Sequence, residues 1–99
     1  AAMRGRVYIA RAGDREVITN YLADFNTKSH EELFSAYNTA QGKGFFGVHH
    51  QGLFIIAMHL TFNKRFAKSP ISVTDNTLIE FTRTIDRVGD SWAYTSILN

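Results

Sequence analysis

Residues 52–62 of the chain read Gly-Leu-Phe-Ile-Ile-Ala-Met-His-Leu-Thr-Phe, an almost unbroken apolar stretch. No strong helix breaker follows before Ser69-Pro70, and strands rarely run beyond about 10 residues. Alanine, methionine, leucine, lysine and arginine in this stretch and after it also favour helix. We therefore predict one long central helix over residues 48–68. The alternative is a pair of strands that turns at Gln51-Gly52.

Length and composition indicate one domain. The chain has 99 residues, of which 44% are hydrophobic and 13% aromatic, enough for one core. Residues 3–99 are expected to form this domain, with Ala1-Ala2 interpreted as a cloning remnant. The absence of cysteine excludes disulfides and thiolate zinc sites. A bilayer span needs about 20 apolar residues, so we expect no membrane segment and a cytoplasmic, bacterial-type protein.

Two more helices are predicted before the central one. Apolar residues recur at helical spacing in the first, at Val17, Ile18, Tyr21, Leu22 and Phe25, and Asp14 is its expected N-cap. The second begins at a capping box, in which Ser29 and Glu32 satisfy each other's backbone N–H groups. We expect Gly42 and Gly44 to end it, with Gly42 in a left-handed C-cap.

The period changes to two near both ends of the chain, which predicts strands at residues 7–12, 79–86 and 91–98. A turn at Val88-Gly89-Asp90 joins the last two. The predicted fold class is α+β, in the order β-α-α-α-β-β. The N-terminal strand would join the C-terminal hairpin in one small antiparallel sheet, with about three helices packed on one face.

His59 is the polar residue deepest within the apolar stretch, and its two ring nitrogens need partners there. One interpretation is a hydrogen bond to a core tyrosine such as Tyr21 or Tyr37. The other is a small ligand pocket lined by His59, His49, His50, Tyr37 and Arg83. A metal site is not expected, because on one helix residues nine apart lie on opposite faces.

Arg83 interrupts the apolar face of its predicted strand, between Phe81 and Ile85. It would either protect a strand edge with its charge or bind an anion or a partner, paired with an acid such as Glu16 or Glu32. The serines and carboxylates follow no catalytic pattern, and Gly-x-Ser-x-Gly is absent. We therefore lean toward a protein that binds rather than catalyses, and expect no cofactor.

Three functions remain open from the sequence. The first is a homodimeric interaction protein, joined across the open sheet face or an edge strand by Trp92, Tyr94, Tyr8, Thr82 and Thr84. The second is a small-molecule-binding domain or minor enzyme with the pocket around His59. The third is weak nucleic-acid contact through Lys43, Lys64, Arg65 and Lys68, although a formal charge of +2 is small for a dedicated nucleic-acid binder.

Overall fold

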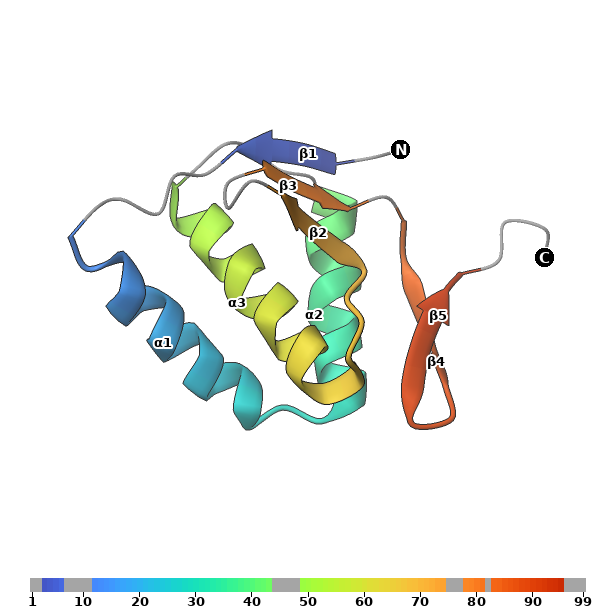
Figure 1. Cartoon of the computed structure of the whole chain (residues 1–99). Helices are drawn as coiled ribbons and strands as arrows, with labels where there is room; N and C mark the ends of the chain where they lie inside the picture. Colours follow the sequence, from blue (N-terminus) through green and yellow to red (C-terminus); the bar gives the residue numbers. More distant parts are fainter. Residues whose placement is uncertain (1–2, 7–11, 44–48, 75–77, 82, 96–99) are drawn as a thin grey trace.

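The computed structural model of the chain describes residues 3–6, 12–43, 49–74, 78–81 and 83–95. Within these ranges the fold is α+β, as predicted, with helices that are separate in sequence from most of the strands (Figure 1). The elements follow in the order β1 (Met3–Arg6), α1 (Asp14–Asn26), α2 (His30–Lys43), α3 (His49–Phe66), β2 (Ile71–Thr74), β3 (Leu78–Phe81), β4 (Ile85–Val88) and β5 (Ser91–Tyr94).

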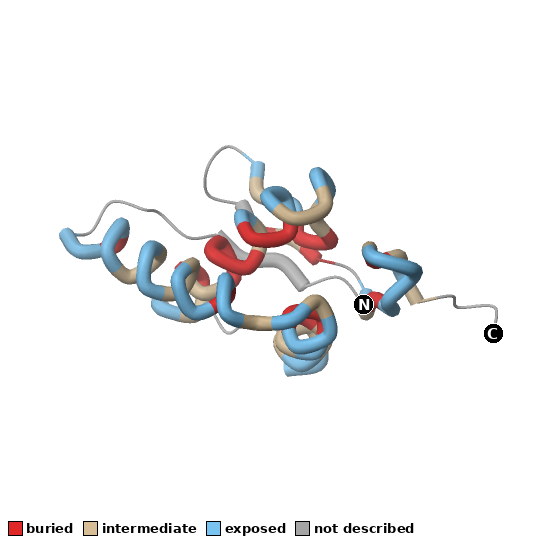
Figure 2. The backbone as a smooth tube through the Cα atoms, turned by 90° about the horizontal axis from the view of Figure 1, so that it is seen from below, coloured by how far each residue is buried: buried red, intermediate tan, exposed pale blue. Residues whose placement is uncertain are grey.

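Helix α3 is the centre of the fold, and the strand-pair alternative for this region is wrong. Eight of its residues are buried, and they come from all around the first four turns, as its apolar sequence requires. The helix ends where Ala67 takes a left-handed conformation with φ 57°, so it does not reach Lys68. The buried residues gather in the middle of the molecule, and exposed residues follow the outer sides of the helices (Figure 2).

The predicted starts of the first two helices have different outcomes. The capping box of α2 is confirmed, because the Ser29 N–H donates to Glu32 Oε1 at 2.9 Å and the Glu32 N–H donates to Ser29 Oγ at 3.1 Å. The N-cap prediction for α1 is wrong. Gly13 holds that position with φ 89°, and Asp14 is the first helical residue.

The predicted left-handed C-cap at Gly42 is also wrong, since the helix continues through Lys43, and Gly44 lies outside the described residues. A glycine can lie within a helix at a modest cost, so its presence alone does not mark an end.

The prediction of a single sheet is wrong. The structure has an antiparallel three-stranded sheet in the order β1-β3-β2 and a separate antiparallel hairpin of β4 and β5. The strand predicted over residues 79–86 is interrupted after Phe81, and its two halves belong to different sheets. β1 pairs with β3 and not with the hairpin. The strand predicted over residues 7–12 lies outside the described residues except for Ala12, which is in a turn.

The hairpin lies beside α2, on the side away from α1 (Figure 1). The Asn38 side chain attaches it there. Asn38 Nδ2 donates to the Ile85 carbonyl oxygen at 2.9 Å, and Asn38 Oδ1 accepts the Ile85 N–H at 2.8 Å. This amide therefore satisfies the edge of β4 as a neighbouring strand would.

Phe62 of α3 is the hub of an aromatic core. Its ring stacks on Phe34 with centroids 5.9 Å apart, and meets Tyr37 and Trp92 edge-on at 5.9 and 6.2 Å. All four side chains are at most 5% exposed. Because edge-to-face and offset contacts add to the energy of burial, this cluster joins α2, α3 and the hairpin.

Candidate binding site between two helices

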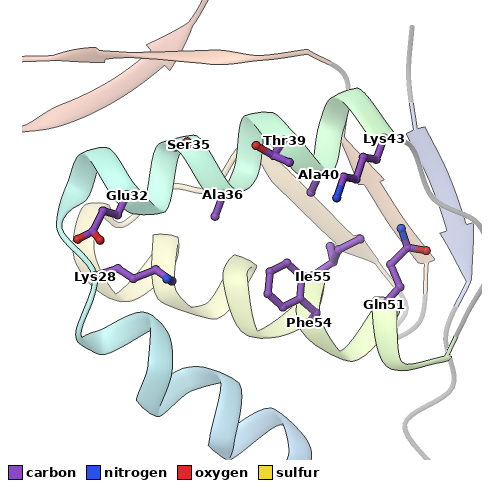
Figure 3. Close-up of a pocket in the computed structure, with 10 residues that line it drawn as sticks. All are labelled: Lys28, Glu32, Ser35, Ala36, Thr39, Ala40, Lys43, Gln51, Phe54 and Ile55. Atoms are coloured by element: carbon purple, nitrogen blue, oxygen red, sulfur yellow. The ribbon is translucent and has the colours of Figure 1, made fainter.

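A hollow of about 550 Å³ lies between α2 and α3 (Figure 3). Its apolar lining comes from Ala36 and Ala40 of α2 and from Phe54 and Ile55 of α3. The polar lining comes from both helices and from the connection between α1 and α2, with the residues Lys28, Glu32, Ser35, Thr39, Lys43 and Gln51. The site therefore combines an apolar floor with polar groups at its rim, the usual composition of a ligand pocket.

Side-chain size on α2 leaves this space open. The residues that face it recur three and four positions apart, which places them on one side of the helix. Between Glu32 and Lys43 they are small: Ser35, Ala36, Thr39 and Ala40. Opposite them, the Phe54 ring is held by α1, with centroid distances of 5.2 Å to both Tyr21 and Phe25. The floor of the hollow is therefore fixed from the side of α1.

The three charged residues at the rim, Glu32, Lys28 and Lys43, differ in how strongly the rest of the chain binds them. Glu32 is engaged by the capping box, and the backbone N–H of Ser29 lowers the pKa of its carboxyl, with smaller contributions from the Ser29 hydroxyl and Lys28. The Lys28 ammonium lies 3.9 Å from Asp24, a carboxylate whose side chain is 64% exposed. Lys43 is exposed and makes no ion pair or hydrogen bond with the described part of the chain. Positive charge is therefore available at this rim.

His59 does not line this hollow, and it is not bonded to Tyr21 or Tyr37. Its Nδ1 lies 2.9 Å from Ser69 Oγ, and its Nε2 lies 3.2 Å from Asn63 Nδ2. Ser69 Oγ also accepts the N–H of Ile71 at 3.0 Å. Partial burial lowers the pKa of His59, with a smaller opposing effect from the backbone of Ile71. The side chain thus links the end of α3 to Ser69, just before β2.

The other members of the predicted pocket lie apart from His59. His49 Nε2 is 2.9 Å from Oδ1 of the buried Asp14, which connects the first turns of α3 and α1. His50 is exposed in the same first turn of α3. Neither histidine nor His59 is among the residues that line the hollow between α2 and α3.

Tyr37 contacts the backbone of Arg83 and not its side chain. The Tyr37 hydroxyl donates to the Arg83 carbonyl oxygen at 2.6 Å, and burial raises the pKa of this hydroxyl, with a smaller effect of Tyr94. The Arg83 guanidinium lies over the Tyr94 ring, 4.9 Å from its centroid. It forms no ion pair with Glu16 or Glu32.

Trp92, one of the predicted dimer anchors, is a core residue of this chain. It is 5% exposed, its Nε1–H donates to the Lys68 carbonyl oxygen at 3.3 Å, and Lys68 Nζ donates back to the Trp92 carbonyl oxygen at 2.8 Å. Tyr94 is 38% exposed, and the Thr84 hydroxyl bonds to Thr95 at 3.0 Å. Tyr8 and Thr82 lie outside the described residues.

Two members of the predicted basic cluster, Arg65 and Lys68, are bound by other parts of the chain. Arg65 donates to the carbonyl oxygens of Phe25 and Lys28 at 2.8 Å each, which caps the end of α1. Lys68 is bound to Trp92, and its ammonium lies 4.6 Å from the indole centroid. Lys64 and Lys43 remain exposed.

A second hollow, of about 530 Å³, lies between α2 and β4. An ion pair crosses its edge, since Arg87 donates to Glu31 at 3.1 Å, and Asp86 adds another carboxylate to its lining. Its lining is accordingly more polar than that of the hollow between α2 and α3.

The described residues contain no group of three or more histidines, aspartates or glutamates placed to hold a metal ion. Across the same ranges, every helix is too short or too polar to cross a membrane.

Comparison with known proteins adds no relative: no protein-family model, curated protein sequence or solved structure matches the chain.

Proposed function

We propose that this protein binds a small, largely apolar ligand in the hollow between α2 and α3. The observation that carries the proposal is a space of about 550 Å³ with an apolar floor and a polar rim. Ligand sites for small molecules typically span about 300 to 1,000 Å³ and have this composition.

The packing around the hollow supports a preformed site. Phe54 is fixed by the two rings of α1, and Ile55 is 1% exposed. α2 is held on its opposite flank by Phe34 and Tyr37. A ligand would therefore meet two helices that are already anchored elsewhere, which reduces the entropy lost on binding.

The test is a titration with the neutral apolar fluorophore N-phenyl-naphthylamine, whose emission rises in an apolar site. We expect saturable binding to the wild-type protein. Ala40→Phe places a ring in the hollow and should weaken binding at least about tenfold, which corresponds to roughly 1.4 kcal/mol.

The matched control is Ala23→Phe, which adds the same ring at an exposed position of α1 outside the lining. Circular dichroism and thermal unfolding would establish that both variants fold. Equal affinity of the two folded variants for the fluorophore would contradict the proposal.

Self-association is a second candidate, favoured by exposed apolar side chains on the hairpin. Val88 of β4 is 60% exposed and Tyr94 of β5 is 38% exposed. Light scattering of the wild type and of Val88→Asp would test it. A dimeric mass for the wild type and a monomeric mass for Val88→Asp are expected if the hairpin is the interface. A monomeric wild type would contradict it.

A further inference from the structure

We infer that the ligand of the hollow between α2 and α3 is an elongated molecule with an anionic group at each end and an apolar body between them. This inference rests on the proposed function and adds the chemical class of the ligand. It follows from the placement of Lys28 and Lys43, which enter the site from opposite ends with their ammonium groups directed inward (Figure 3).

Within the described part of the chain, the two ammonium groups differ in how much negative charge lies near them. Lys43 has no partner among the described residues, and the Asp24 carboxylate is 3.9 Å from Lys28 and largely solvated. Glu32, the acid in the lining, already accepts the Ser29 N–H at 2.9 Å. Anionic groups of a ligand would therefore complement both ends of the site, and Lys43 would be the stronger of the two.

The region between the lysines excludes a compact, highly charged ligand. Ala36, Ala40 and Phe54 line it, and a charged group placed there would lose water without gaining an ionic partner. Along α2, the lining extends from Glu32 to Lys43, which corresponds to about 16 Å at 1.5 Å per residue. An aliphatic or aromatic body of that length, with acidic ends, matches this arrangement.

Isothermal titration calorimetry with dodecanedioate, dodecanoate and the dimethyl ester of dodecanedioate tests the inference. At low salt, we expect dodecanedioate to bind about tenfold more tightly than its diester and several-fold more tightly than dodecanoate. Added sodium chloride should reduce this advantage, because salt screens exposed charges.

Variants of the two lysines identify the contacts. Lys43→Gln should weaken dodecanedioate binding about fivefold and leave the diester unchanged, and Lys28→Gln should have a smaller effect because Asp24 and Glu32 share its charge. Lys64→Gln is the control, since Lys64 is exposed on α3 outside the lining.

The outcomes separate the two proposals. Equal affinity for dodecanedioate and its diester, with both displacing the fluorophore, would overturn the anionic class and leave the hollow as a ligand site. Equal affinity for dodecanedioate and dodecanoate would overturn the second anionic end. Failure of the fluorophore itself to bind would instead overturn the proposed function.

Discussion

The two flanks of α2 meet α3 in opposite ways. On one flank, Phe34 and Tyr37 contact Phe62 and close the space with aromatic rings. On the other, Ala36 and Ala40 leave a hollow above Phe54. The same pair of helices is thus stabilised where its side chains are large and open where they are small. Because each ring adds buried area and dispersion contacts, the closed flank contributes more to the stability of the helix pair than the open flank does.

The largest expected effect breaks the closed flank. Phe62→Ala removes the ring shared by Phe34, Tyr37 and Trp92, and should lower the free energy of unfolding by about 3–5 kcal/mol. Urea denaturation measures this change. Leu60→Ala is the control on the same helix, because Leu60 is 42% exposed. A loss for Phe62→Ala no greater than that for Leu60→Ala would contradict the role of Phe62 as the hub.

The second largest loss of stability is expected for Arg65, which binds the backbone at the end of the hollow where Lys28 lies. Arg65→Ala removes the donors to the Phe25 and Lys28 carbonyl oxygens, and should lower the free energy of unfolding by about 2 kcal/mol. Arg65→Lys keeps the charge but loses the planar fork, so we expect an intermediate loss. Chemical denaturation of both variants provides the measurement. If the alanine variant were as stable as wild type, Arg65 would not be a significant cap of α1.

A smaller change in stability is expected when the open flank of α2 is filled, which tests the difference between the two flanks. Ala40→Leu adds apolar volume to a flank that has room for it, and should change the free energy of unfolding by less than about 1 kcal/mol. The same variant should bind the neutral fluorophore more weakly than wild type. A large loss of stability, measured by thermal unfolding, would mean that this flank has no free space.

The smallest effect is the pH dependence of stability that comes from His59, which lies on neither flank of α2. Partial burial lowers the pKa of His59 in the folded state below its ordinary value of 6.5, so the unfolded chain binds the proton more readily. Stability from this group is therefore fully present above pH 6.5 and is lost as the pH falls toward the folded pKa. We expect the wild type to lose more stability between pH 7.5 and 5.5 than His59→Gln does.

His50→Gln is the control for this pH series, because His50 is exposed on the same helix. Its loss of stability between the two pH values should match that of the wild type. Parallel losses in the wild type and in His59→Gln would show that His59 does not contribute to the pH dependence.

Sequence reasoning predicted the helices better than the strands. Helical periodicity is local, and the capping box needs only Ser29 and Glu32, so both features could be predicted without the rest of the fold. The break after Phe81 could not, because it depends on which neighbours the two halves of the predicted strand find. Alternation within one strand carries no information about its partner.

The candidate site shows the same limit. A signal for the hollow was present, since Ser35, Ala36, Thr39 and Ala40 recur on one side of α2 between charged residues. Small residues at helical spacing do not reveal whether a neighbouring helix fills the space they leave. The histidines drew attention to His59 instead, whose ring is bonded to Ser69 across the end of α3.

The sequence by itself therefore determined the presence of the helices, the α+β class and one apolar core, because these follow from local periodicity and from the apolar content of residues 52–62. The tertiary structure alone decided that the strands form two sheets, that Trp92 packs inside and that the hollow lies between α2 and α3. These features depend on distances between residues remote in the chain, and such distances are set only when the elements pack.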